Sequence, residues 1–225
     1  IQDMIAPWLI GQDPLMIEKL ATRLKGDGRL APRPWIVENA LWDILGKKAG
    51  LPAYKVMGGY RDHIPAYAAM CELRSDEERQ EDALRLFDEG FRAVKLRLFM
   101  PTIKEDIHIV ENIRKAVGDK MTIICDANQG PVRDRNFEGG RVPFWTYQRA
   151  LEMAKELHDL GVLWLEEPLD HYDIHGIRRL TEETEIAIAG GEIMNGIQDI
   201  TTLIDNECYD IYLSLIHISE PTRLA

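Results

Sequence analysis

The sequence predicts an α/β fold in which a parallel sheet forms part of a (β/α) barrel. Two observations lead to this prediction. After residue 62, short apolar segments alternate regularly with helical patterns, and this alternation is typical of parallel strands joined by right-handed crossover helices. In addition, charged residues follow several apolar segments at the point where each strand is expected to end. In such a barrel these strand ends form one rim, where active sites lie.

Residues 1–62 are predicted to be helical. Asp13 and Pro14 are typical of a helix cap followed by proline at the first helical position, and a second helix is expected to start near Pro34. The apolar stripe of this second helix would consist of Val37, Leu41, Ile44 and Leu45.

Residues 63–212 are predicted to hold about six strands with helices between them. Strands are expected at 64–69, 93–99, 121–125, 162–165, 186–189 and 209–212. Helices are expected at 75–87, around 107–117 and at 145–160, with Leu84 on the buried side of the first. The polar, glycine-rich segment 129–142 is predicted to be a loop at the rim. A closed eight-stranded barrel needs roughly 250 residues, so we expect a partial TIM-type barrel.

The composition excludes several classes of protein. The 225 residues carry 38 acidic and 27 basic side chains, a formal net charge of −11, whereas a nucleic-acid binder normally shows a basic face. No apolar run approaches the roughly 20 residues that span a bilayer, and no signal-peptide pattern precedes the first helix. The three cysteines are odd in number and widely spaced, which favours a reducing compartment. We therefore expect a cytoplasmic protein with no nucleic-acid or membrane partner.

Charged side chains follow four successive predicted strands. They are separated by 31, 40 and 26 residues, each about one strand-plus-helix unit, and comprise Lys95 with Arg97, Asp126, Glu166 with Glu167, and Glu192. Lys95 and Arg97 are two residues apart and should point to one face of their strand. On this geometry the carboxylates of Asp126, Glu166 and Glu192 converge.

Three converging carboxylates repel one another unless a cation lies between them. Oxygen-only ligands that leave positions open favour Mg²⁺, or Mn²⁺, over zinc. Taken singly, Asp126 could be a loop-capping aspartate, and Glu166 and Glu192 could be solvated loop acids. The histidines His63, His108, His158, His171 and His175 are expected at the surface or in helices, with the alternative that His171, which follows Glu166-Glu-Pro168, approaches a substrate. Trp8, Trp35 and Trp42 are expected in the core.

The combined motifs resemble the mandelate racemase/muconate lactonizing family of the enolase superfamily. They are Lys95-x-Arg97, Asp126-Ala-Asn128, Glu166-Glu-Pro168 and Gly191-Glu192. Segments 38–47 and 51–59 are also similar to the last capping-domain helix of that family and the turn after it. The resemblance implies a partial TIM-type barrel preceded by the helical remnant of an α+β capping domain.

The same resemblance implies a reaction, in which a proton α to a carboxylate is removed from a small carboxylate substrate, here expected to be a sugar acid. Asp126, Glu166 and Glu192 would bind Mg²⁺. Lys95 and Arg97 would be the catalytic residues and would also bind substrate, together with Asn128. By analogy with the family, the full-length parent protein is expected to be a homo-oligomer.

Position 97 departs from the commonest pattern of the family, which has a second lysine there as base. Arginine is a poor base because its pKa exceeds about 12, although it clamps carboxylates well. A racemase needs a base on each face of the substrate carbon, whereas a dehydratase can work with one. We therefore expect dehydration of a sugar acid to a 2-keto-3-deoxy acid. The alternatives are a racemase, epimerase or cycloisomerase of the same superfamily, or a non-catalytic barrel that retains the metal site.

Residues 213–225 are expected to be foreign to the rest of the sequence. In the family, a strand such as 210–212 usually continues into a polar segment, but here Leu-Ser-Leu-Ile-His-Ile-Ser-Glu-Pro-Thr-Arg-Leu-Ala follows. The chain is accordingly expected to be a truncated fragment that lacks the catalytic base and has no turnover by itself.

Overall fold

The computed structural model describes residues 2–27, 35–72, 74–130, 136–137, 140–141, 144–194 and 197–213. The described chain falls into two compact units, with the division between Ile64 and Pro65. Of the segment expected to be foreign, residues 214–225 lie outside the described part. No helix among the described residues is long and apolar enough to cross a membrane.

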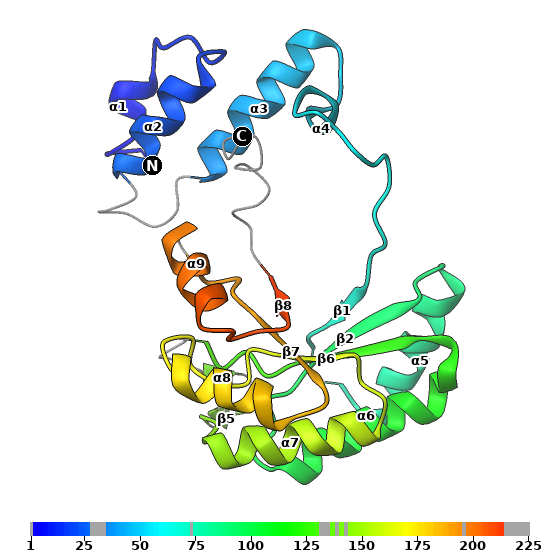
Figure 1. Ribbon diagram of the computed structural model, residues 1–225. Coiled ribbons are helices and arrows are strands. Elements are labelled where there is room, and N and C mark those ends of the chain that lie inside the picture. Colours follow the sequence, from blue (N-terminus) through cyan, green and yellow to red (C-terminus); the bar gives the residue numbers. More distant parts are fainter. Residues whose placement is uncertain are drawn as a thin grey trace. The chain divides into compact units, whose positions relative to one another are not determined.

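The first unit is helical, as predicted (Figure 1). Its helices are α1 (Ala6–Leu9), α2 (Ile17–Asp27), α3 (Trp35–Ala49) and α4 (Ala53–Val56). Ile17, Leu20 and Leu41 form a small core, and Trp8 and Trp42 pack against it. These two tryptophans therefore contribute to the core, as expected, whereas the side chain of Trp35 lies outside the described part.

Two details of the first unit differ from the prediction. The helix does not begin at Pro14, because Asp13 closes a separate turn in which its carbonyl accepts the Met16 N–H at 3.1 Å and its Oδ1 accepts the Leu15 N–H at 3.0 Å. Helix α2 starts only at Ile17. In α3, Ile44 is 40% exposed and does not belong to the buried stripe.

The second unit contains an open sheet of six parallel strands in the order β1-β2-β3-β6-β7-β8. The strands are β1 (Ala68–Met70), β2 (Ala93–Arg97), β3 (Thr122–Asp126), β6 (Trp164–Glu166), β7 (Ala187–Gly190) and β8 (Ile211–Tyr212). This sheet, which is not closed within the described residues, confirms the predicted partial α/β barrel. The predicted rim loop also holds an antiparallel pair, β4 (Asn136–Phe137) with β5 (Gly140–Arg141).

Helices follow the strands and pack on the sheet. They are α5 (Asp76–Asp88), α6 (Ile103–Val117), the short 3₁₀ helix η1 (Gly118–Lys120), α7 (Tyr147–Asp159), α8 (Ile174–Glu183) and α9 (Ile197–Asp205). Figure 1 shows α5, α6, α7 and α8 along one face of the sheet. Helices α5 and α6 both begin with a capping box, Ser75 with Glu78 and Thr102 with Glu105, which satisfies amide groups that the first turn leaves free.

Side chains along β2 point alternately to the face of the sheet that the helices cover and to the opposite face. Val94 and Leu96 are fully buried, whereas Lys95 and Arg97 are half-buried and point the other way. Helix α6, expected around residues 107–117, buries Ile107, Val110, Ile113 and Val117.

Two expectations about the second unit are wrong. Strand β1 begins at Ala68 rather than Ile64, and Ile64 is 78% exposed, because the segment before Ala68 has no strand partner among the described residues. In α5 the inward position is Ala83, so that the neighbouring Leu84 points outward and is 46% exposed.

Candidate metal and carboxylate site

The strand ends bring the predicted charges to one edge of the sheet. In the register of the parallel strands, Arg97 lies beside Asp126, and Asp126 lies beside Glu166. Glu166 in turn lies beside Ala189 of β7, three residues before Glu192. These positions follow directly from the strand alternation, because residues at matching places on parallel strands point to the same side.

Lys95 joins the carboxylates of Asp126 and Glu166. Its Nζ lies 3.1 Å from Asp126 Oδ2 and 2.9 Å from Glu166 Oε1. All three side chains are largely removed from solvent, and that of Glu166 is only 1% exposed. The ends of the neighbouring strands β3 and β6 thus each give one carboxylate oxygen to the Lys95 ammonium of β2.

The pKa values of Lys95 and Glu166 both lie above their usual values. Burial alone would lower the pKa of Lys95, but the charges of Asp126 and Glu166 outweigh it and raise the pKa above its usual value. Burial and the charge of Asp126 raise the pKa of Glu166, and the hydrogen bond and charge of Lys95 oppose this rise. Lys95 is therefore held as an ammonium ion at neutral pH.

The other oxygen of each carboxylate is held by a donor two residues away. The Asn128 N–H donates to Asp126 Oδ1 at 2.8 Å, in a turn where Asn128 has φ +47°. The Trp164 indole Nε1–H donates to Glu166 Oε2 at 3.3 Å. Each carboxylate therefore presents its remaining oxygen to the same nitrogen.

The remaining predicted site residues lie at the same edge. Arg97 is half-buried at the end of β2, on the same face as Lys95, and Asn128 is half-buried in the turn after β3. Glu192 follows β7, is half-buried, and is not part of the cluster around Lys95. In the part of the chain that the structure describes, no three acidic, histidine or cysteine side chains gather closely enough to hold a metal ion.

Glu167, the second carboxylate of the Glu-Glu pair, is a buried acid that the sequence reasoning left without a role. It is 2% exposed, and neither carboxylate oxygen has a hydrogen-bond partner among the described residues. Burial, followed by the charges of Glu192 and the other nearby carboxylates, raises its pKa to about 8. The left-handed backbone at Glu167 (φ +44°) allows its N–H to reach the Ala189 carbonyl at 2.8 Å.

The absence of a side chain at Gly130 makes room for the side chain of Glu167. A Cβ at this position would lie 3.0 Å from Glu167 Oε2 and would also collide with the Ile193 side chain. The base of the rim loop is fixed just before this point, where the buried Gln129 accepts the Trp145 N–H at 2.9 Å and donates to the Ala127 carbonyl at 3.0 Å.

His171 departs from the expectation for the histidines. It is 6% exposed, and within the described part of the chain its Nδ1 has no hydrogen-bond partner, although Asp170 Oδ1 lies 3.9 Å away. Burial lowers its pKa.

An aromatic pair that sequence reasoning also missed lies next to the charged cluster. The rings of Tyr67 and Trp164 meet edge to face, with centroids 6.3 Å apart. Lys95 Nζ lies 5.6 Å from the centroid of the Tyr67 ring. The sequence does hold a signal for Trp164, since the spacing Trp164-x-Glu166 places both side chains on one face of a strand.

The donor chemistry of the cluster fits a hard divalent cation. Asp126 and Glu166 offer oxygen atoms only, and both reach one point, because both lie within 3.1 Å of Lys95 Nζ. Mg²⁺ prefers such oxygen ligands. The position of Glu192 does not complete a three-carboxylate set in this structure.

The fold and these charges define an α/β-barrel protein with an acidic site at the carboxyl ends of its strands. Residues 78–217 match the family model described as enolase C-terminal domain-like. The chain belongs to this family, which confirms the resemblance to the mandelate racemase/muconate lactonizing proteins.

Characterised relatives and solved structures agree with this assignment. The L-talarate/galactarate dehydratase of Salmonella typhimurium is 30% identical over 89% of this chain and 49% of its own length. The structure of L-talarate dehydratase from Polaromonas sp. JS666, complexed with Mg and L-glucarate, has a TM-score of 0.76 and 30% identity over 93% of this chain and 57% of that one. A racemase from Streptomyces coelicolor A3(2) with bound magnesium has a TM-score of 0.81 and 27% identity over 95% and 62%.

Other relatives are named as cycloisomerases, epimerases or racemases, at similar levels of identity. Identity therefore does not separate one activity from another. The chain spans about half the length of the curated relatives it matches.

Proposed function

We propose that this protein takes part in the Mg²⁺-dependent removal of a proton α to the carboxylate of a sugar acid, and that the reaction is dehydration to a 2-keto-3-deoxy acid. The observation that carries the proposal is the buried ammonium of Lys95 between Asp126 and Glu166 at the carboxyl edge of a parallel sheet. Relatives named as dehydratases of galactarate and arabinonate support the sugar-acid class.

Asp126, Glu166 and Glu192 are the proposed ligands of Mg²⁺, with Mn²⁺ as a substitute. Asp126 and Glu166 are already close, and Glu192 would complete the set from the end of the neighbouring strand. When bound, Mg²⁺ would polarise the substrate carboxylate and neutralise the negative charge that builds up as the proton leaves.

The chain's own cations would bind and orient the substrate. Lys95 is held charged by two carboxylates and would neutralise one substrate carboxylate oxygen from the sheet side. Arg97, two residues further along the same face, has the planar fork that binds a carboxylate or a pair of hydroxyl groups. Asn128, in the turn after β3, would contact the polyol part of the substrate.

Neither cation is a competent base at neutral pH. The raised pKa of Lys95 keeps it protonated, and a guanidinium does not release its proton in this range. The proton acceptor would therefore come from residues other than these two. We accordingly expect the 225-residue chain alone to bind Mg²⁺ and a sugar acid without turnover.

Calorimetric titration of the chain with a panel of aldonic and aldaric acids, with and without Mg²⁺, tests the binding step. We expect saturable binding that requires Mg²⁺ and that Arg97→Lys weakens roughly tenfold, because a charge-assisted bond contributes about 1.5 kcal/mol or more. Arg92→Lys, at the residue just before the opposite end of this strand, is the matched control and should bind normally. If the affinity for the sugar acid is the same without Mg²⁺ and in Arg97→Lys, the proposal is contradicted.

The reaction itself is tested on the intact parent gene product with the same panel. A 2-keto-3-deoxy product supports dehydration. Racemised or epimerised sugar acid without any keto product would show that the reaction is a 1,1-proton transfer and that Arg97 does not preclude it. Metal and substrate binding without any conversion of substrate would instead identify a non-catalytic barrel.

A further inference from the structure

The two carboxylates that share Lys95 are held in the same way. Each places one oxygen on Lys95 Nζ and gives the other to an N–H donor two residues away in the chain. For Asp126 the donor is the backbone N–H of Asn128, which the turn after β3 fixes. For Glu166 the donor is a side chain, the indole of Trp164.

From this parallel we propose that Trp164 is a positioning residue for Glu166, whose indole N–H fixes Oε2 so that Oε1 faces the cation-binding point. The inference rests on the proposed function, because it assigns Glu166 to the cation. It goes beyond that function in adding a residue that does not itself touch metal or substrate.

A free carboxylate can rotate about its last torsion, and a longer side chain such as glutamate has more freedom than aspartate. In the 1% exposed site of Glu166, water cannot substitute as a partner for Oε2. Losing the indole N–H would therefore leave Oε2 to compete with Oε1 for Lys95 or for a metal ion.

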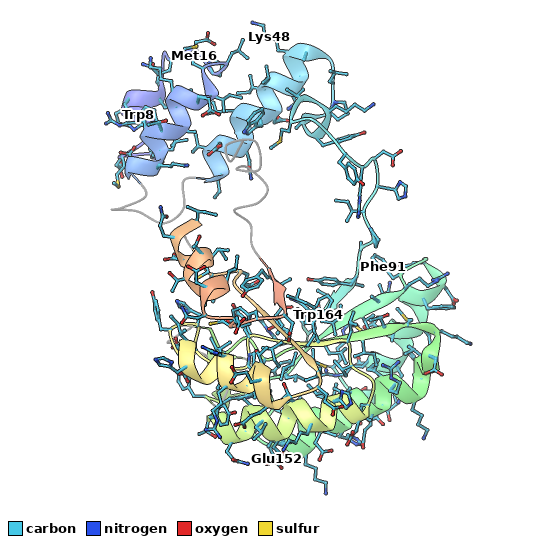
Figure 2. The ribbon with its side chains drawn as sticks, in the orientation of Figure 1. Trp8, Met16, Lys48, Phe91, Glu152 and Trp164 are labelled. Carbon is cyan, nitrogen blue, oxygen red and sulfur yellow. The ribbon has the colours of Figure 1, made fainter. Side chains whose placement is uncertain are left out.

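The indole is itself held in place. Trp164 lies on the strand that carries Glu166, two residues earlier and on the same face, and Figure 2 labels it at the side of the sheet away from α5–α7. The Tyr67 ring meets the indole edge to face, and the same ring faces Lys95 Nζ at 5.6 Å. The Tyr67 ring thus contacts both the Lys95 ammonium and the indole that donates to Glu166.

Trp164→Phe tests the inference, because it keeps an aromatic ring against Tyr67 and removes the N–H donor together with part of the indole volume. We expect the Kd for Mg²⁺, measured by calorimetry, to rise about tenfold, since loss of an outer hydrogen bond to a metal ligand typically costs 10- to 100-fold in affinity and this bond is long. The melting temperature of the variant should show that the fold persists.

Trp8→Phe is the matched control. Its indole N–H also donates to a carboxylate, Asp27 Oδ2 at 2.9 Å, but in the helical unit. The same type of bond is lost, so a general effect of removing an indole would appear in both variants. We expect Trp8→Phe to bind Mg²⁺ as the wild type does.

NMR spectroscopy can detect the hydrogen bond between Trp164 and Glu166 in the absence of metal. The chain has five tryptophans, so ¹⁵N-labelled tryptophan gives five indole N–H resonances, and Trp164→Phe identifies the one from Trp164. We expect Glu166→Met, which removes the acceptor at similar volume, to move this resonance upfield, and Mg²⁺ to shift it in the wild type.

The outcomes separate this inference from the proposed function. The positioning role is overturned if Glu166→Met does not shift the Trp164 resonance, or if Trp164→Phe binds Mg²⁺ as tightly as the wild type. Either result leaves the proposed metal site unaffected. If the wild type binds no Mg²⁺ while the resonance still depends on Glu166, the hydrogen bond is real and the proposed function fails.

Discussion

Asp106 is a buried carboxylate in the first turn of α6, and replacing it with asparagine tests how burial and hydrogen bonding compete in this fold. Its Oδ1 accepts the backbone N–H groups of Phe99 and Met100, both at 3.0 Å, and its Oδ2 accepts Arg149 Nη2 at 3.1 Å. These bonds pin the loop that follows β2, the strand that carries Lys95. Burial nevertheless dominates and raises the pKa of Asp106 from 3.8 to about 6.

The size and sign of the effect follow from that shift. A rise of roughly two pKa units corresponds to about 3 kcal/mol. Because the folded state holds the proton more tightly than the unfolded state, this contribution to stability is fully present below about pH 4 and is lost as the pH rises through about 6. The amide of Asp106→Asn does not titrate, and its oxygen can still accept the two backbone bonds. The stability of the wild type relative to the variant should therefore fall by about 3 kcal/mol between pH 4 and pH 7.

Urea unfolding followed by circular dichroism at a series of pH values from 3.5 to 8 measures this difference. Below pH 4 both side chains are neutral, so that range is an internal control for packing effects of the substitution. Parallel stability curves would refute the reasoning. A difference that grows in favour of the wild type toward pH 7 would show that the Arg149 ion pair outweighs burial.

Three further substitutions have expected effects on the free energy of unfolding. Arg114→Met should cost about 2 kcal/mol, because the guanidinium donates to four backbone carbonyls where α6, β3 and the α7–β6 turn meet. The exposed Arg178→Met is the control and should leave the free energy of unfolding nearly unchanged. Gly190→Ala should cost about 2 kcal/mol by overpacking, since its Cβ would lie 2.7 Å from the Tyr209 hydroxyl; an unchanged denaturation midpoint would contradict this. Thr102→Ala should cost about 1 kcal/mol by removing the capping box of α6, and calorimetric melting without a shift would argue against it.

Much of the fold could be predicted because local patterns and tertiary structure agree. The stripe of α6 from Ile107 to Val117 has helical spacing and is buried as a whole. The alternation of Lys95 and Arg97 with apolar neighbours indicated which face of β2 carries charge. Where such agreement is missing, the prediction was wrong: Leu84 looks like a core residue, but the smaller Ala83 faces the sheet.

The candidate site could be predicted only in part. Strand ends place Asp126 and Glu166 side by side, because register follows from the order of the strands. The sequence does not show that Lys95 pairs with these two while Glu192 lies outside the cluster and its charge acts on Glu167, since that choice depends on side-chain rotamers and charge balance in three dimensions. Nor does it show the burial of Glu167 and His171, which depends on backbone turns after β6.

The central claim is that Asp126, Glu166 and Glu192 form one divalent-cation site. Calorimetric titration of the chain with Mg²⁺ tests it most directly, with Asp126→Asn, Glu166→Gln and Glu192→Gln compared against Glu182→Gln on the exposed face of α8. We predict one equivalent of saturable binding in the wild type and in Glu182→Gln, and at least tenfold weaker binding in each of the other three. Wild-type affinity in Asp126→Asn, or no saturable binding in any protein, would contradict the claim.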